Sequence, residues 1–288
     1  MSQSDLRHHA AWREMPDLVA VALGGDDRID WLQGQITNDL RGRSDGEVLD
    51  FCVCEPTGQL LAPCRAQIQP DQILILLPKQ CLSGFMDRVD QMVIIEDVWA
   101  KVQDFRVVSL QGPNASQFLP SVAAIPSDRT GFGGYDLLIS GDEKLTVPES
   151  DPADWEAARL EAGIPIFGVD MGPRTLLPEM GPAFESRNIS YKKGCYTGQE
   201  VLMRIHSRGH TNQTWLGVIL DDEASIGANV SHAAREDAGI VTSVATSSRF
   251  GPIAAAMMRR EASEGEVQVG EVRGTLTPLP IMGFVISP

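Results

Sequence analysis

The sequence has no long uninterrupted run of apolar residues. Nowhere in its 288 residues do apolar side chains approach the roughly 20 in a row that a membrane-spanning helix needs. Residues 1–16 mix charged side chains such as Arg7 and Glu14 with scattered apolar ones, and so lack the apolar centre of a secretory signal. With 43% hydrophobic residues, the chain can nevertheless bury a sizeable core. We therefore expect a globular, cytoplasmic protein.

Cysteine is scarce, and its five copies are scattered: Cys52, Cys54, Cys64, Cys81 and Cys195. An odd, widely spaced set argues against a disulfide framework and for reduced thiols. Cys52 and Cys54 would face the same side of a strand, with Cys64 across a turn, which leaves a metal site conceivable. Because no Cys-x-x-Cys spacing occurs, buried structural thiols are the favoured interpretation.

Basic residues are outnumbered. Lys and Arg total 24 against 39 Asp and Glu, and the resulting net charge of −15 repels a phosphate backbone. Aromatic residues make up only 6% of the chain and form no stripe on which bases could stack. Direct nucleic-acid binding is therefore not expected.

Common site motifs are also missing. The run from Gly24 to Asp27 lacks both the Gly-x-Gly-x-x-Gly spacing and the Lys-Ser/Thr ending of phosphate loops, so it indicates a turn. His206 and His210 are four apart, as in helical metal-binding pairs, but Gly209 between them argues against a helix there. We predict no metal site from these histidines.

What is present, up to about residue 209, is a mixture of strand-like and helix-like segments. Apolar alternation and short apolar runs predict strands at 18–23, 48–55, 60–69, 73–77, 93–98, 106–110 and 135–140. Helical spacing and composition predict helices at 27–35, 81–92 and 154–162. Pro56 to Gln59 suits a tight turn, so 48–69 is predicted to be a hairpin. This pattern indicates an α+β fold rather than a doubly wound sheet.

Beyond His210 the sequence changes character. Short strand candidates at 215–220, 239–244, 253–258 and 267–272 are separated by Gly, Ser and Asp. Such spacing is typical of a small all-β domain. We place the boundary at 209/210.

Residues 187–210 carry five basic side chains against a single acid, Glu200, within a strongly acidic chain. This segment contains the octet Lys-Gly-Cys-Tyr-Thr-Gly-Gln-Glu, residues 193–200. Its glycines permit positive φ or close backbone approach. If Lys192 or Lys193 points toward the sulfur of Cys195, it favours the thiolate and makes the cysteine reactive. The alternative is a solvated basic loop with an inert cysteine.

The octet, followed by Arg204, resembles the signature of the YgfZ family, which is similar to the glycine-cleavage T-protein and to mitochondrial iron–sulfur assembly factors. Other segments agree in order. They are 31–40 with its Leu-Gln-Gly-Gln-x-Thr-Asn-Asp core, the turn 55–61, the run 159–165, Leu177-Pro178, and 239–243. The likeness extends from about Leu18 to Met258.

This resemblance implies a T-protein-like ring of subdomains with antiparallel sheets and helices, plus a small C-terminal β-barrel. Residues 1–209 would form a folate-binding α+β body of two subdomains, and residues 210–288 the barrel. A tetrahydrofolate derivative would bind in a central channel. Its flat pterin needs paired polar groups, and its anionic glutamate tail suits lysine and arginine.

The resemblance also implies which residues form the site. Cys195 and Lys193 would be the reactive residues. The cofactor-binding residues would be Asn38, Asp39, Tyr196, Gln199, Glu200 and Arg204. The chain departs from its relatives after Pro178, where they commonly place a carboxylate two residues on. Here that position is Met180, and Glu179 comes one residue early.

The implied function is that of an accessory factor, rather than an enzyme, that supports iron–sulfur clusters in client enzymes, including radical enzymes that modify tRNA. Contact with RNA would be indirect. One cysteine cannot supply the four thiolates of a usual cluster, so any cluster would be held transiently or shared with a partner. The alternatives are a folate-dependent aminomethyl- or methyltransferase similar to the T-protein, with Glu179 or Asp39 steering protons, and a folate-dependent demethylating domain. The T-protein lacks the octet, which favours the accessory factor.

Overall fold

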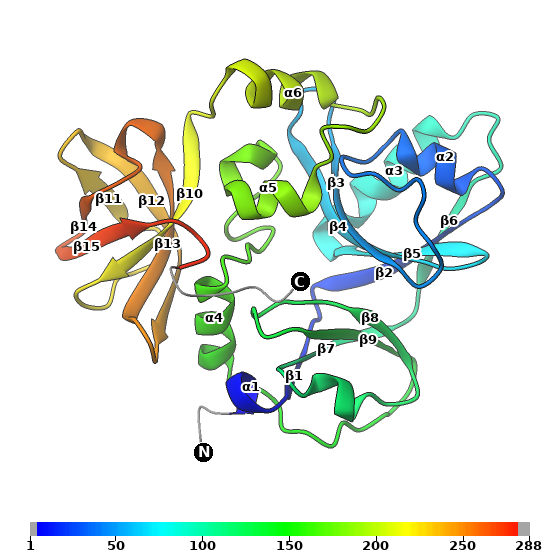
Figure 1. Cartoon of the computed structure of the whole chain (residues 1–288), viewed down its shortest axis with the longest axis horizontal. Helices are drawn as coiled ribbons and strands as arrows, with labels where there is room; N and C mark the ends of the chain where they lie inside the picture. Colours follow the sequence, from blue (N-terminus) through cyan, green and yellow to red (C-terminus); the bar gives the residue numbers. More distant parts are fainter. Residues whose placement is uncertain (1–4, 282–288) are drawn as a thin grey trace.

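The structure is a computed structural model that describes residues 5–281, and it contains three β units placed around a central group of helices (Figure 1). Residues 1–4 of the expected body and residues 282–288 of the expected barrel lie outside the described residues. Within the described part of the chain, no helix is long and apolar enough to cross a membrane.

The first unit is a five-stranded antiparallel sheet, on the right in Figure 1. Its strand order is β3 (Val48–Cys54), β4 (Leu60–Ile68), β5 (Gln72–Pro78), β2 (Leu18–Gly24) and β6 (Trp99–Gln103). Burial along β4 alternates strictly, as expected for a strand with one face against a core, whereas the middle residues of β5 are all buried. The helices α2 (Arg28–Gln33) and α3 (Leu82–Met92) belong to this unit, and η1 (Lys79–Cys81) leads into α3.

The second unit is a four-stranded sheet in the order β1 (Ala11–Glu14), β7 (Arg106–Gln111), β9 (Gly134–Ile139) and β8 (Ala123–Pro126). The short elements α1 (Asp5–His8) and η2 (Ala115–Phe118) accompany it. It has its own small apolar core around Val108, Leu110 and Leu137.

The third unit is a closed six-stranded barrel, on the left in Figure 1. Its strands in order are β10 (Gln213–Leu220), β13 (Gly251–Arg259), β12 (Arg235–Ser247), β11 (Asn229–His232), β14 (Glu266–Val269) and β15 (Val272–Thr277), with η4 (Arg260–Ala262) after β13. Closure removes free sheet edges, which stabilises a small β unit. The predicted C-terminal barrel is thus confirmed, although the domain boundary at 209/210 stays a prediction.

Between these units lie α4 (Pro152–Glu161), η3 (Leu177–Met180) and α5 (Pro182–Asn188), while α6 (Gln199–Arg208) crosses the top of Figure 1 toward the barrel. The start of α4 follows from its sequence, because the side chain of Asp151 accepts a hydrogen bond from the Ala153 amide at 2.8 Å and Pro152 opens the helix. Gly163, just past its end, has φ +62°.

Two sequence predictions of secondary structure were wrong, and some elements, including the helix α6, were not predicted. Residues 93–98 form no strand, because the Glu96 carboxylate accepts hydrogen bonds from the amides of Ile94 and Ile95 and holds a turn. Residues 267–272 are the end of one strand, a turn at Gly270 and the start of the next. The helix α6 was missed, because glycines flank it at 198 and 209 and its composition is polar.

Buried polar groups join α4 to the barrel. Arg159 and Asp170 form an ion pair at 2.8 Å, with side-chain exposures of 2% and 0%. The Asp170 carboxylate also accepts hydrogen bonds at 2.7 Å from the hydroxyls of Thr242 and Ser243 on β12. Two residues after Arg159, the Glu161 carboxylate accepts hydrogen bonds from Arg7 and from Ser247 of β12. These contacts fix the position of the barrel against the body.

We predict that Asp170→Ala lowers the free energy of unfolding by about 3 kcal/mol, because it removes one of the two carboxylates that bind the buried Arg159 guanidinium and leaves only Glu156. The measurement is urea unfolding followed by circular dichroism. The matched control is Asp221→Ala, which removes an ion pair to Arg273 whose partners are 64% and 81% exposed. That change should alter stability by no more than about 1 kcal/mol. Equal effects of the two substitutions would contradict the role given to Asp170.

Candidate functional site

The loop between α5 and α6 carries the only exposed cysteine of the described residues. Cys195 is exposed and free, whereas Cys52, Cys54, Cys64 and Cys81 are free but buried. Desolvation raises the pKa of the buried thiols, to about 12 for Cys54 and Cys81. Cys195 is therefore the one described thiol that a partner can reach.

Lys193 is buried, with 7% exposure, and its ammonium donates three hydrogen bonds to backbone carbonyl oxygens. The acceptors are Gln33 at 2.7 Å, Ile36 at 2.6 Å and Asn38 at 2.8 Å. Burial lowers the pKa of Lys193 to about 8, so the ammonium remains the main form at pH 7. Only the ammonium has three N–H donors for three acceptors.

The orientation proposed from the sequence is therefore corrected. All three donors of Lys193 are bound to carbonyl oxygens, so none is left for the sulfur of Cys195. Lys193 acts as a positioning residue that ties the Cys195 loop to residues 33–38. Lys192 is exposed, and no contact to the sulfur is observed for it among residues 5–281.

Tyr196 anchors the other side of Cys195. It is 7% exposed, and the Nζ atom of Lys193 lies 5.1 Å from the centre of its ring, within cation–π range. Its buried hydroxyl makes no hydrogen bond within the described protein. Desolvation raises the pKa of this phenol, so it is neutral. The next residue, Thr197, donates its amide to the Gly34 carbonyl at 3.3 Å.

Gly198 brings the loop against the β3–β4 hairpin. Its φ is +85°, and an added Cβ would lie 2.6 Å from the carbonyl oxygen of Glu55 and 3.2 Å from the Cα of Gly58. Gly58, at φ +78°, would in turn place a Cβ 2.8 Å from the Cβ of Val201 on α6. Both glycines are needed for this contact between two backbones.

Asn38 and Asp39 have mainly structural partners. The Asn38 amide donates to the carbonyl oxygens of Asp50 and Arg187, at 2.8 and 2.9 Å. The Asp39 carboxylate accepts from the side chain of Gln33 at 2.9 Å and from the amide of Arg41 at 3.2 Å. These residues join the early motif to the segment that precedes Cys195.

Gln199, Glu200 and Arg204 lie on α6. The Gln199 side-chain amide approaches the Gly194 carbonyl at 3.4 Å, which places it beside the Cys195 loop. Glu200 and Arg204 are exposed. Because α6 begins at Gln199, these three residues are carried by a helix, which the sequence analysis did not predict.

Cys52, Cys54 and Cys64, which the sequence left as a conceivable metal site, lie inside the main apolar core. The Sγ of Cys52 contacts the Oδ1 of Asn188 at 3.9 Å. No group of three or more potential metal ligands occurs among residues 5–281. His206 is on α6 and stacks on Tyr191, with ring centres 3.7 Å apart, while His210 lies beyond the helix.

A cavity of about 560 Å³ lies where the body meets the barrel. Its lining includes the segment 168–175, Glu179 of η3, and two barrel residues, Gln213 and Met257. Desolvation raises the pKa of Glu179, whose Oε2 accepts a hydrogen bond from the Leu176 amide at 2.9 Å. Arg174, on the same lining, is exposed and cationic. Of the residues named from the sequence, only Glu179, a candidate of the transferase alternative, lines this cavity.

The cavity and the Cys195 loop share one support. Thr175 offers its carbonyl to the Leu60 amide at 2.9 Å, and Leu176 pairs with Gln59. The cavity wall is thus bonded to the start of β4, beside the turn against which Gly198 packs.

The sequence patterns did not indicate Arg174, and they argued against a pterin contact by Glu179 because this carboxylate comes one residue early. Arg174 and Glu179 could have been selected because they follow closely after the segment 168–172, which begins and ends with glycine.

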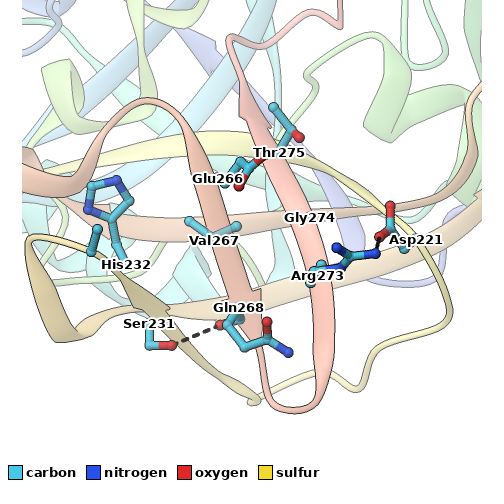
Figure 2. Close-up of a pocket in the computed structure, with 10 residues that line it drawn as sticks. Asp221, Ser231, His232, Glu266, Val267, Gln268, Arg273, Gly274 and Thr275 are labelled. Carbon is cyan, nitrogen blue, oxygen red and sulfur yellow. Dashed lines mark hydrogen bonds and ion pairs between the residues drawn. The ribbon is translucent and has the colours of Figure 1, made fainter.

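A second cavity, of about 410 Å³, lies on strands β11, β14 and β15 of the barrel (Figure 2). Figure 2 shows an exposed ion pair between Arg273 and Asp221, at 3.3 Å, and a hydrogen bond from Ser231 to the Gln268 carbonyl. It contains none of the predicted site residues.

Comparisons with known proteins agree with the motifs. No family model matches the chain. An uncharacterized protein of Haemophilus influenzae is 24% identical over 217 residues, which cover 73% of this chain and 74% of that protein. The tRNA-modifying protein YgfZ of Colwellia psychrerythraea is 23% identical over 219 residues, covering 68% and 67%. The protein of the same name from Yersinia pseudotuberculosis is 24% identical over 229 residues, covering 70% and 69%.

A solved structure shares the fold. The glycine cleavage system aminomethyltransferase T from Bartonella henselae superimposes with a TM-score of 0.82, over 99% of this chain and 90% of that one. The two sequences are 16% identical, so this likeness concerns the fold alone. The expected T-protein-like architecture is confirmed.

We predict that Lys193→Met lowers the free energy of unfolding by about 3 kcal/mol, because a side chain of similar length leaves three carbonyl oxygens without a donor. Thermal and urea unfolding provide the measurement. Lys192→Met, at the exposed neighbouring position, should change stability by less than about 0.5 kcal/mol. Should Lys193→Met unfold like the wild type, the ammonium would not hold the loop.

Proposed function

Because its curated relatives and its fold support placing this chain in the YgfZ family, we propose that it is a tetrahydrofolate-binding accessory factor for iron–sulfur enzymes. It supports the assembly or repair of clusters in client enzymes, including tRNA-modifying radical enzymes. The net charge of −15 favours contact with the client protein rather than with the RNA itself. Five free thiols suit a reducing compartment such as the cytoplasm.

The observation that carries this proposal is the exposed Cys195 on a loop that is fixed at both sides. Lys193 and Tyr196 are buried on either side of it, and Gly198 packs against the hairpin. The sulfur is therefore presented at a defined place and remains open to a partner. One thiolate can complete the ligand set of a cluster held mostly by another protein, but it cannot hold a usual cluster alone.

The residues of the 560 Å³ cavity fit a folate. Its volume lies within the range of about 300–1,000 Å³ that is usual for cofactor sites. The partly desolvated Glu179 offers a carboxylate for the donor edge of the pterin, and Arg174 offers a cation for the glutamate tail. Tetrahydrofolate would supply one-carbon transfer chemistry when bound. In this assignment Asn38 and Asp39 support the Cys195 loop, and the binding role of Arg204 stays a prediction.

A second candidate function is that of a folate-dependent aminomethyl- or methyltransferase. It is favoured by Glu179, which lines the cavity and whose pKa is raised by burial, because a carboxyl group that holds its proton more firmly is suited to proton transfer in a reaction. Formation of methylenetetrahydrofolate from an aminomethylated carrier, with release of ammonia, would support this activity.

We predict that Cys195→Ala abolishes rescue of iron–sulfur enzyme activity in cells that lack their own homologue, while the purified variant keeps the wild-type melting temperature. The thermal result follows from the exposure of the side chain. The matched control is Gly194→Ala, whose added methyl group meets no atom within 4 Å, and which should rescue fully. Full rescue by Cys195→Ala would remove the thiol from the mechanism.

We also predict that tetrahydrofolate raises the melting temperature. At about 100 times the dissociation constant, a ligand specific for the folded state adds about 2.7 kcal/mol, which corresponds to roughly 5 °C for a chain of this size. A polyglutamate tail should increase the shift, and Arg174→Gln should remove that increase. Glu179→Gln should reduce the shift for both ligands. Arg273→Gln, in the barrel cavity of Figure 2, is the control. Absence of any shift at saturation would contradict the folate site.

A further inference from the structure

The turn after α3 exposes two adjacent isoleucines. Ile94 and Ile95 are 82% and 92% exposed, and among the described residues they are the two most exposed large hydrophobic side chains. Met92 before them and Trp99 after them are also partly exposed. Single exposed apolar residues are ordinary, but a group of them within one short segment indicates a contact surface. We call residues 92–99 the isoleucine turn.

The isoleucine turn is held firmly by hydrogen bonds. The Glu96 carboxylate accepts from the amides of Ile94 and Ile95, at 2.9 and 3.0 Å. At the start of the turn, the indole of Trp31 donates to the Met92 carbonyl at 3.1 Å. The two isoleucines are therefore presented in one conformation, which lowers the entropy lost when a partner binds.

The other end of the turn is tied to the bend after β2. The Asp97 amide donates to the Asp27 carboxylate at 2.8 Å, and the Asp26 amide donates to the Asp97 carboxylate at 3.0 Å. Trp99 covers Gly24, where even a Cβ would come within 2.1 Å of the indole ring. The absence of a side chain at position 24 thus leaves room for the Trp99 ring.

The charge around the isoleucine turn is mainly negative. The carboxylates of Glu96 and Asp97 within the turn, and of Asp26 and Asp27 beside it, form no ion pair in the described part of the chain. Arg28, next to Asp27, instead donates its guanidinium N–H groups to the carbonyl oxygens of Gly25 and Pro70. Backbone hydrogen bonds from Ile94, from Glu96 itself and from Ile95 hold the pKa of Glu96 below its usual value. The surface is therefore an apolar projection with an acidic rim.

We propose that the isoleucine turn docks the iron–sulfur client protein, by inserting Ile94 and Ile95 into an apolar pocket rimmed by lysine and arginine. The carboxylates meet the basic rim, and the buried isoleucines supply most of the affinity, as is usual at the centre of an interface. That the partner is the client rests on the proposed function. The chemistry of the partner surface rests on the turn alone.

A second copy of the chain suits this surface less well. Two acidic rims would face each other in a symmetric dimer, and each molecule carries a net charge of −15. An RNA partner meets the same repulsion.

The first test uses rescue of client activity in cells without the homologue. Ile94→Ser combined with Ile95→Ser should reduce rescue by about tenfold or more, the size expected for losing two central anchors. The purified double variant should keep the wild-type melting temperature, its stabilisation by tetrahydrofolate and the alkylation rate of Cys195. The matched control combines Ile226→Ser with Ile240→Ser, at two barrel residues that are 65% and 54% exposed, and it should rescue fully.

The outcomes separate this proposal from the proposed function. If the wild type rescues and the Ile94/Ile95 variant rescues equally, the docking surface is wrong and the accessory function stands. If the wild type itself fails to rescue, the accessory function falls, and a second measurement decides the docking surface.

That measurement is photo-crosslinking of the full-length protein in cells, with a benzophenone amino acid at position 95 and, as control, at position 226. A crosslink specific to position 95, mapped to an apolar pocket with basic neighbours on one protein and weakened by Ile94→Ser, supports docking. A crosslink to another copy of this chain, to RNA, or to nothing beyond the products of position 226 overturns it. In extracts, salt should weaken the supporting crosslink, because it screens the carboxylates.

Discussion

The ammonium of Lys193 holds together two parts of the chain that are about 160 residues apart. Its three carbonyl acceptors lie at the last residue of α2, Gln33, and just after the helix, at Ile36 and Asn38, and two of these contacts are fully buried. The same residue stands two positions before Cys195 and lies against the ring of Tyr196. A charge that appears from the sequence to activate a thiol therefore works by fixing where that thiol is presented.

The Cys195 loop and the cavity beside the barrel are connected through the β3–β4 hairpin. Gly198 packs on its turn, Leu176 pairs with Gln59 at the end of that turn, and the Thr175 carbonyl accepts a hydrogen bond from Leu60 at the start of β4. Occupation of the cavity by a folate would thus stabilise the same turn that supports the cysteine. Such coupling needs no direct contact between ligand and sulfur, since both sites gain from one ordered element.

The barrel takes its position from buried carboxylates rather than from apolar packing alone. Asp170 has all its bonds to Arg159, Ile166, Thr242 and Ser243, so it lines the cavity without being available to a ligand. Glu179 differs, because one backbone amide is the only donor to its carboxylate in the described residues. Asp170 therefore helps to shape the cavity, whereas Glu179 is the carboxylate that a ligand could bind.

Local sequence patterns determined most strands, the helix α4 with its Asp151 cap and Gly163 end, the C-terminal β unit, and Cys195 as the candidate thiol. These features depend on neighbours along the chain, through apolar periodicity and turn chemistry. Only the tertiary structure decided the partners of Lys193, the burial of Cys52, Cys54 and Cys64, the position of Glu179 and Arg174 on one cavity, and the turn at Ile94 and Ile95. Each of these features depends on contacts between residues that are far apart in the sequence. The spacing of residues along the chain does not indicate which distant groups form a hydrogen bond or pack together.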